Sequence, residues 1–120
     1  MSTALYSLGL HEALSLLEKR EISSFELTEA HLARIEAVDG RIKAYLSVGA
    51  EQALDQARRA DALRAKGEAG LLCGAPLGLK DLLCTKELPT TCGSRMLEHF
   101  ISPYNATVVD KLLDAGAVIL

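Results

Sequence analysis

The sequence has 120 residues, of which 49% are hydrophobic and 24% are charged, as is usual for a globular domain with a modest core. Thirteen basic and sixteen acidic residues give a net charge of −3, which argues against the basic face that charge-driven nucleic-acid binding requires. No apolar stretch approaches the length of a membrane span. Residues 1–6 lack the basic and apolar regions of a signal peptide. We therefore expect a cytoplasmic protein that contacts no membrane.

The pattern of apolar residues predicts five helices and three strands. The helices are expected over residues 8–20, 24–39, 50–66, 94–100 and 107–115, and the strands over residues 42–48, 77–82 and 117–120. The second helix opens with Ser23 and Glu26 at the spacing of a capping box, and Gly40 is expected to stop it.

The last four residues, Ala117-Val118-Ile119-Leu120, follow directly on Gly116. A helix, a glycine and then an uninterrupted apolar run are typical of a chain that enters a buried parallel strand. Two or three such strands faced by several helices would leave apolar surface and sheet edges uncovered. The residues therefore predict an α/β fold that is incomplete at its C-terminus, the front part of a larger domain.

One lysine lies inside an apolar stretch, residues 74–83. In strand geometry Gly78 and Lys80 would share one face, and Asp81 would lie on the other. Leucines around Lys80 would partly desolvate its amine and favour the neutral form, which can act as a base. The common alternative is a lysine at a strand end that reaches water or pairs with a carboxylate, and the residues alone favour that alternative.

Other candidate chemistry is weaker. Cys73, Cys84 and Cys92 have no C-x-x-C spacing, so we interpret them as free thiols of unassigned role. The three histidines are scattered, which argues against a metal site. His31 falls on an apolar helix face and is interpreted as a histidine at the edge of the core. Neither a phosphate-binding loop nor a G-x-G-x-x-G motif is present, so we expect no cofactor bound by this chain.

Residues 74–81, Gly-Ala-Pro-Leu-Gly-Leu-Lys-Asp, resemble the lysine-bearing strand of the amidase signature family. Flanking segments agree with this resemblance in order and spacing, and within the family they are similar to the glutaminase subunits of aspartyl/glutamyl-tRNA amidotransferases. These segments are residues 23–28, 34–39, 82–86, 89–97 and 103–109.

The resemblance implies the fold and a catalytic role. The fold would be a mixed sheet layered with helices, and residues 1–120 would form the N-terminal part of a single amidase domain. The family uses a Ser–cis-Ser–Lys triad, in which the lysine is the ultimate base and carries over to Lys80. The two serines belong to a downstream signature that nothing in this sequence matches, so Ser23, Ser24 and Ser94 are not assigned as nucleophiles.

The resemblance also implies partners. A glutaminase subunit of this group would hydrolyse glutamine and pass ammonia to subunits B and C. These subunits use ATP and Mg²⁺ to amidate Glu-tRNA(Gln) or Asp-tRNA(Asn), so this chain would meet tRNA only indirectly. Two alternatives remain open: an amidase of the same family that acts on another small amide, and a truncated folding or binding fragment without catalysis. For the 120 residues alone we expect no activity and poor solubility.

Overall fold

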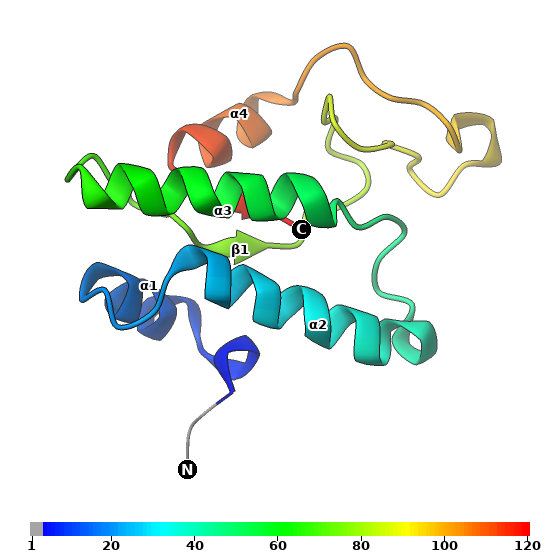
Figure 1. Ribbon diagram of the computed structural model, residues 1–120. Helices are drawn as coiled ribbons and strands as arrows, with labels where there is room; N and C mark the ends of the chain where they lie inside the picture. The colour runs from blue at the N-terminus through cyan, green and yellow to red at the C-terminus, as the bar shows by residue number, and fades with distance from the viewer. Residues whose placement is uncertain (1–3) are drawn as a thin grey trace.

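A computed structural model describes residues 4–120 of the chain. Short 3-10 turns, longer helices and two short strands alternate along it (Figure 1). The elements in chain order are η1 (Leu5–Ser7), α1 (Leu10–Glu18), α2 (Ser24–Ile42), α3 (Ala50–Ala65), β1 (Pro76–Leu77), η2 (Arg95–Leu97), α4 (Thr107–Asp114) and β2 (Val118–Ile119).

The two strands pair in parallel, with Pro76 opposite Val118 and Leu77 opposite Ile119. Backbone hydrogen bonds extend this pairing beyond the strands at both ends. The added bonds join Leu72 N to Ala115 O (3.0 Å), Gly74 N to Gly116 O (2.8 Å) and Leu120 N to Leu77 O (3.0 Å). Residues 72–77 therefore lie side by side with residues 115–120, although about forty residues of chain separate them.

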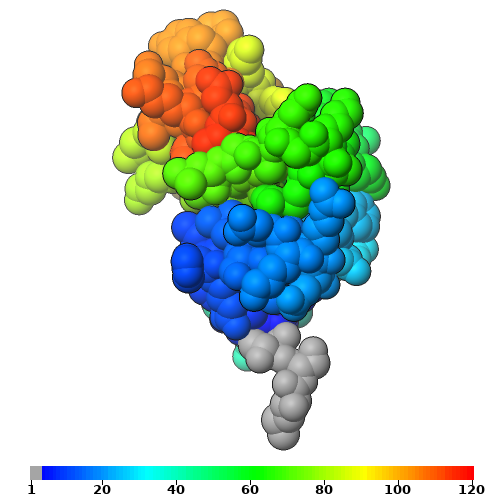
Figure 2. Space-filling model, turned by 90° about the vertical axis from the view of Figure 1, so that its left-hand side faces the viewer, coloured from blue at the N-terminus to red at the C-terminus, as the bar shows by residue number. Residues whose placement is uncertain are grey.

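Helices α2 and α3 pack on each other and against the strand pair, so that β1 lies between α3 and α2 in Figure 1. One apolar cluster joins Ala53 and Ala57 of α3 to Val118 and Leu120. The alanines have small side chains, which lets α3 approach the strands closely. The space-filling view shows the same stacking, with α1 and α2 in blue, α3 in green and α4 in orange to red (Figure 2).

The N-terminus of α2 is capped twice. Ser23 Oγ accepts the Glu26 N–H (3.1 Å) and Glu26 accepts the Ser23 N–H (2.8 Å), which is the capping box that the spacing predicts. Asp61 of α3 accepts the N–H groups of Ser24 (2.7 Å) and Phe25 (3.1 Å). The second cap bonds α2 to α3 and satisfies donors that a helix start leaves free.

The prediction of a strand over residues 42–48 is wrong. Helix α2 runs past Gly40 to Ile42, and the chain then continues without regular structure to α3. The Asp39 carboxylate accepts the N–H groups of Ala44 (2.7 Å) and Tyr45 (3.4 Å), and Lys43 turns the chain in the left-handed region, with φ 56°. The Asp39 side chain thus accepts backbone N–H groups that, in a strand, would donate to a neighbouring strand.

Two further predicted elements are much shorter than expected. The strand expected over residues 77–82 is not formed at that length, because β1 ends at Leu77 and Leu83 N donates to Lys80 O (3.0 Å) in a turn. The last backbone hydrogen bond of the strand pair joins Leu120 N to Leu77 O. The helix predicted over residues 94–100 is the 3-10 turn η2, which Ser94 caps through Met96 N (3.3 Å).

Residues 84–106 form an excursion that extends away from the helices (yellow to orange in Figure 1). Its two ends are joined where Ala106 N donates to Cys84 O (2.8 Å), and its two arms are joined where Thr90 N donates to Phe100 O (2.9 Å). Among residues 4–120 no helix is long and apolar enough to cross a membrane.

The close approach of Gly116 to Cys73 generates a stability prediction. A Cβ at Gly116 would lie 2.7 Å from Cys73 Cα, and Gly116 has φ +87°. We expect Gly116→Ala to lower the free energy of unfolding by about 2–4 kcal/mol, because left-handed backbone strain and overpacking add. Urea unfolding followed by circular dichroism measures the change.

Gly67 supplies the matched control. It also has positive φ (+76°), but an added Cβ meets nothing within 4 Å. Gly67→Ala should therefore cost only the backbone strain, about 1 kcal/mol. Equal losses for the two variants would show that the contact with Cys73 contributes nothing.

Candidate functional site

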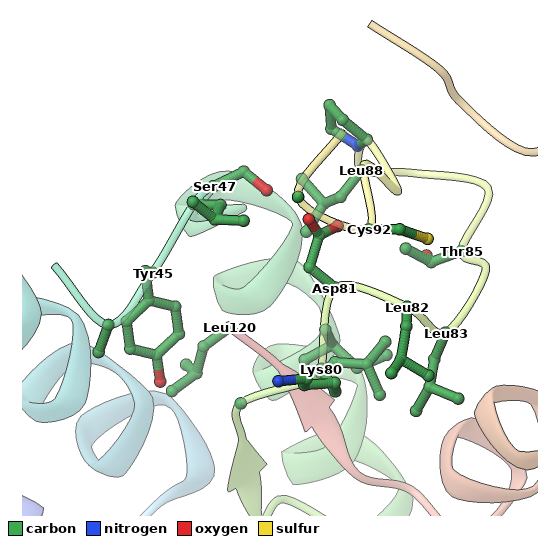
Figure 3. A pocket seen from close by; sticks show the side chains of 17 residues that line it. Tyr45, Ser47, Lys80, Asp81, Leu82, Leu83, Thr85, Leu88, Cys92 and Leu120 are labelled. Atoms are coloured by element: carbon green, nitrogen blue, oxygen red, sulfur yellow. The ribbon is translucent and has the colours of Figure 1, made fainter. Parts of the chain in front are cut away.

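A cavity of about 780 Å³ lies beside the end of the strand pair. Three segments line most of it: residues 44–47 after α2, residues 78–83 after β1, and part of the excursion between residues 85 and 93. Ile119 and Leu120 complete the lining. Most of these side chains are apolar, and Lys80 is the only cation among them (Figure 3).

Lys80 reaches the cavity because the chain leaves the sheet just before it. β1 ends at Leu77, and the backbone turns after Lys80. In Figure 3 the Lys80 amine points toward the side of the cavity where Tyr45 lies. The structure thus places the predicted candidate in the lining of this cavity.

The desolvated environment expected for Lys80 is absent from this structure. Lys80 is exposed, and Leu82 on the following turn is 54% exposed. The expectation assumed a strand over residues 77–82 in which leucines flank the lysine, whereas β1 ends at Leu77. In the described part of the chain, the Lys80 side chain therefore lies at the cavity but stays exposed to solvent.

The Asp81 carboxylate points away from the Lys80 amine, toward the segment that carries Cys92 (Figure 3). Its carboxylate accepts the Thr91 N–H (2.8 Å) and the Thr91 hydroxyl, and its backbone carbonyl accepts the Cys92 N–H (2.9 Å). These bonds join the Lys80 turn to the excursion. Asp81 therefore has a structural role in joining these two segments.

Tyr45 is a cavity residue that the sequence analysis missed as a site residue, because residues 42–48 have the alternation of a strand. Its hydroxyl lies 3.0 Å from the position of a Cβ on Gly78, and its ring packs on the cluster that contains Val118 and Leu120. Burial, together with the negative charge of Asp39, raises the pKa of Tyr45. The phenol therefore stays neutral and adds a polar group to this end of the cavity.

The cysteines and histidines do not converge on a site. Cys73 is buried, Cys84 is half-buried and Cys92 is exposed, and all three are free thiols. Within residues 4–120 no cluster of three or more histidine, cysteine or acidic side chains could hold a metal ion. Cys92 lines the cavity, and no histidine lies beside it there.

Comparison with known proteins identifies the family. The family model described as Amidase matches residues 26–120, which is most of the chain. The chain belongs to the amidase family.

Curated relatives of the chain include subunits A of glutamyl-tRNA(Gln) amidotransferases. The chain is 57% identical over 117 residues to the subunit from Moorella thermoacetica, and 53% identical over 113 residues to the one from Desulfotalea psychrophila. The alignments cover 97% and 94% of this chain, but only 24% and 23% of the relatives. The chain thus spans about a quarter of their length.

Solved structures of amidases confirm the fold class. The peptide amidase of Stenotrophomonas maltophilia superposes with a TM-score of 0.89 at 35% identity, covering 95% of this chain and 24% of that one. A bacterial aryl acylamidase of the amidase signature family superposes with a TM-score of 0.88 at 23% identity, over 98% of this chain and 25% of that one. The chain therefore has the fold of about a quarter of an amidase, as the resemblance predicts.

His31 generates a prediction about pH. It is half-buried on α2, and burial lowers its pKa. The folded state then binds a proton less readily than the unfolded state, so the free energy of unfolding should fall as the pH drops through about 6.5. Urea unfolding at pH 7 and pH 5 measures this loss, and His31→Gln should reduce it.

The exposed His11 offers a control for this experiment. His11→Gln should keep the pH dependence of the unsubstituted chain. If His31→Gln and His11→Gln lose the same stability between pH 7 and pH 5, burial of His31 does not govern this range.

Proposed function

We propose that this chain supplies the base of an amide-hydrolysing site, and that Lys80 is that base. The observation that carries the proposal is the position of Lys80 as the only cation of the cavity lining in residues 4–120. The family matched by residues 26–120 supports amide hydrolysis as the chemistry. The relatives are about four times as long as this chain. The exposure of the lysine fits a site to which further residues of such a longer protein contribute.

The proposed reaction is acyl transfer from an amide. A serine hydroxyl attacks the amide carbon, and its proton passes through a second hydroxyl to the neutral Lys80 amine. The carbon–nitrogen bond then breaks, and the leaving ammonia takes the proton back from the lysine. Water hydrolyses the acyl-enzyme by the same proton path. Both serines would come from sequence outside these 120 residues.

We further propose glutamine as the substrate and an amidotransferase as the setting. The curated relatives described above are named as components of a glutamyl-tRNA(Gln) amidotransferase. The ammonia would pass to subunits B and C, where ATP and Mg²⁺ are used to amidate Glu-tRNA(Gln) or Asp-tRNA(Asn) in the cytoplasm. The net charge of −3 fits a protein that reaches tRNA only through its partners.

A second candidate is a free-standing amidase for another small amide. The similarity to the peptide amidase, at 35% identity and a TM-score of 0.89, supports this alternative. The two differ in their dependence on partners. Glutamine hydrolysis that rises when subunits B and C are added supports the amidotransferase, and partner-independent hydrolysis of peptide amides supports the amidase.

A third candidate is a fragment that folds or binds without catalysis. The open cavity and the exposed lysine support it for the 120 residues alone, for which we expect no release of glutamate from glutamine. Turnover by the isolated chain that Lys80→Ala abolishes would contradict this expectation.

The role of Lys80 can be tested in a full-length chimera. This chimera carries the present chain in place of the aligned 57%-identical segment of the Moorella thermoacetica relative, assembled with that organism's other amidotransferase subunits. We expect Lys80→Ala to lower kcat for glutamine hydrolysis by about a thousandfold or more, because the nucleophile then has no base. Glutamate release measures the rate.

Lys86 is the matched control, since it is exposed on the excursion and outside the cavity lining. Lys86→Ala should keep kcat within about twofold of the unsubstituted chimera. Near-normal turnover in Lys80→Ala would remove Lys80 from the mechanism.

A further inference from the structure

The backbone that carries Lys80 has no strand partner among residues 4–120. Pairing with β2 ends where Leu120 N donates to Leu77 O, three residues before the lysine. A flexible lysine on an unpaired segment would hold its amine poorly, and catalysis requires the reacting groups to be held in a narrow geometry. Other contacts must therefore fix this segment.

Three hydrogen bonds to the excursion fix it directly after Lys80. Asp81 accepts two of them through its carboxylate, from the N–H and the hydroxyl of Thr91. Its carbonyl accepts the third, from Cys92 N (2.9 Å). Asp81 and Thr91 are both half-buried, and hydrogen bonds to an ionised carboxylate are among the stronger ones.

The same bonds determine which side of the chain the carboxylate occupies. The Asp81 carboxylate points away from the Lys80 amine, toward the segment that carries Cys92 (Figure 3), where it accepts the Thr91 N–H. Released from Thr91, this carboxylate could turn to the neighbouring amine. An ion pair would stabilise the ammonium form of the lysine. This form has no lone pair and cannot accept a proton from the nucleophile. In residues 4–120 the only ion pair within 4.0 Å joins Arg58 to Asp55, so Lys80 has no carboxylate partner there.

We propose that Asp81 and Thr91 are positioning residues for Lys80. Their two-point hydrogen bond anchors the turn from which the amine enters the cavity, and it holds the adjacent carboxylate away from that amine. This inference rests on the proposed function of Lys80. On this inference the excursion, through Thr91, helps to hold the Lys80 amine in position.

The test uses the full-length chimera described above. Thr91→Val keeps the size of the side chain and removes the hydroxyl, and Asp81→Asn removes the charge and leaves one acceptor oxygen. We expect both variants to lower kcat for glutamine hydrolysis by about tenfold or more with KM nearly unchanged, since neither group has to bind substrate. Thr91→Ser keeps the hydroxyl and should retain most of the rate.

Thr107 is the matched control, because it is exposed on α4 and lies outside the cavity lining. Thr107→Val makes the same chemical change and should leave kcat unaltered. The unfolding midpoints of all variants are measured as well. A lower kcat with an unchanged midpoint indicates misplacement of Lys80, whereas a lower midpoint indicates general destabilisation. If Thr91→Val does not fold, the comparison of Asp81→Asn with the unsubstituted chimera decides the result alone.

The Lys80→Ala background completes the test. A positioning role predicts that Thr91→Val has no further effect on the residual rate once the lysine is absent, because its effect acts through that lysine. The inference is overturned if a folded Thr91→Val or Asp81→Asn variant keeps the parental kcat. It is also overturned if Thr91→Val lowers the rate equally with and without Lys80. Full turnover in Lys80→Ala alone would instead overturn the proposed function.

Discussion

The parallel pairing of residues 72–77 with residues 115–120 is the constraint on which the rest of the structure depends. It joins two segments far apart in sequence through a short series of backbone hydrogen bonds that begins at Leu72 and ends at Leu120. The pairing is possible because Gly116 lets the backbone pass close to Cys73. Helices α2 and α3 then pack on the paired strands, where Ala53 and Ala57 form an apolar core with Val118 and Leu120.

The end of this pairing determines where the cavity forms. The chain leaves the sheet after Leu77 and carries Lys80 into an open space. Tyr45 bounds this space from the segment after α2, and Leu88, Pro89 and Cys92 bound it from the excursion. Residues from three separate parts of the chain therefore surround one lysine, although none of them buries it.

The helices could be predicted from the sequence because each has a local signal. Ser23 and Glu26 mark the start of α2, and the alanines at positions 53, 57 and 60 mark the buried face of α3.

The error over residues 42–48 has a local cause that the alternation of apolar residues does not show, since the Asp39 carboxylate accepts the backbone N–H groups of Ala44 and Tyr45. The length of the strand near Lys80 depends on the extent of β2, which no property of residues 77–82 encodes. The candidate lysine is evident from its motif, whereas the hydrogen bonds between Asp81 and Thr91 are not, because they join segments that only the fold brings together. The exposure of the lysine is not evident either, because burial is a property of the whole domain and this chain spans about a quarter of its relatives.

Lys80 is exposed in this chain, and we propose that it is enclosed when the rest of an amidase domain is present. Amine acylation by a water-soluble active ester, quantified by mass spectrometry, tests it directly in the isolated chain and in the full-length chimera. We expect Lys80 to be acylated rapidly in the isolated chain and to be protected in the chimera, while Lys86 reacts in both. Equal acylation of Lys80 in the two proteins would contradict it.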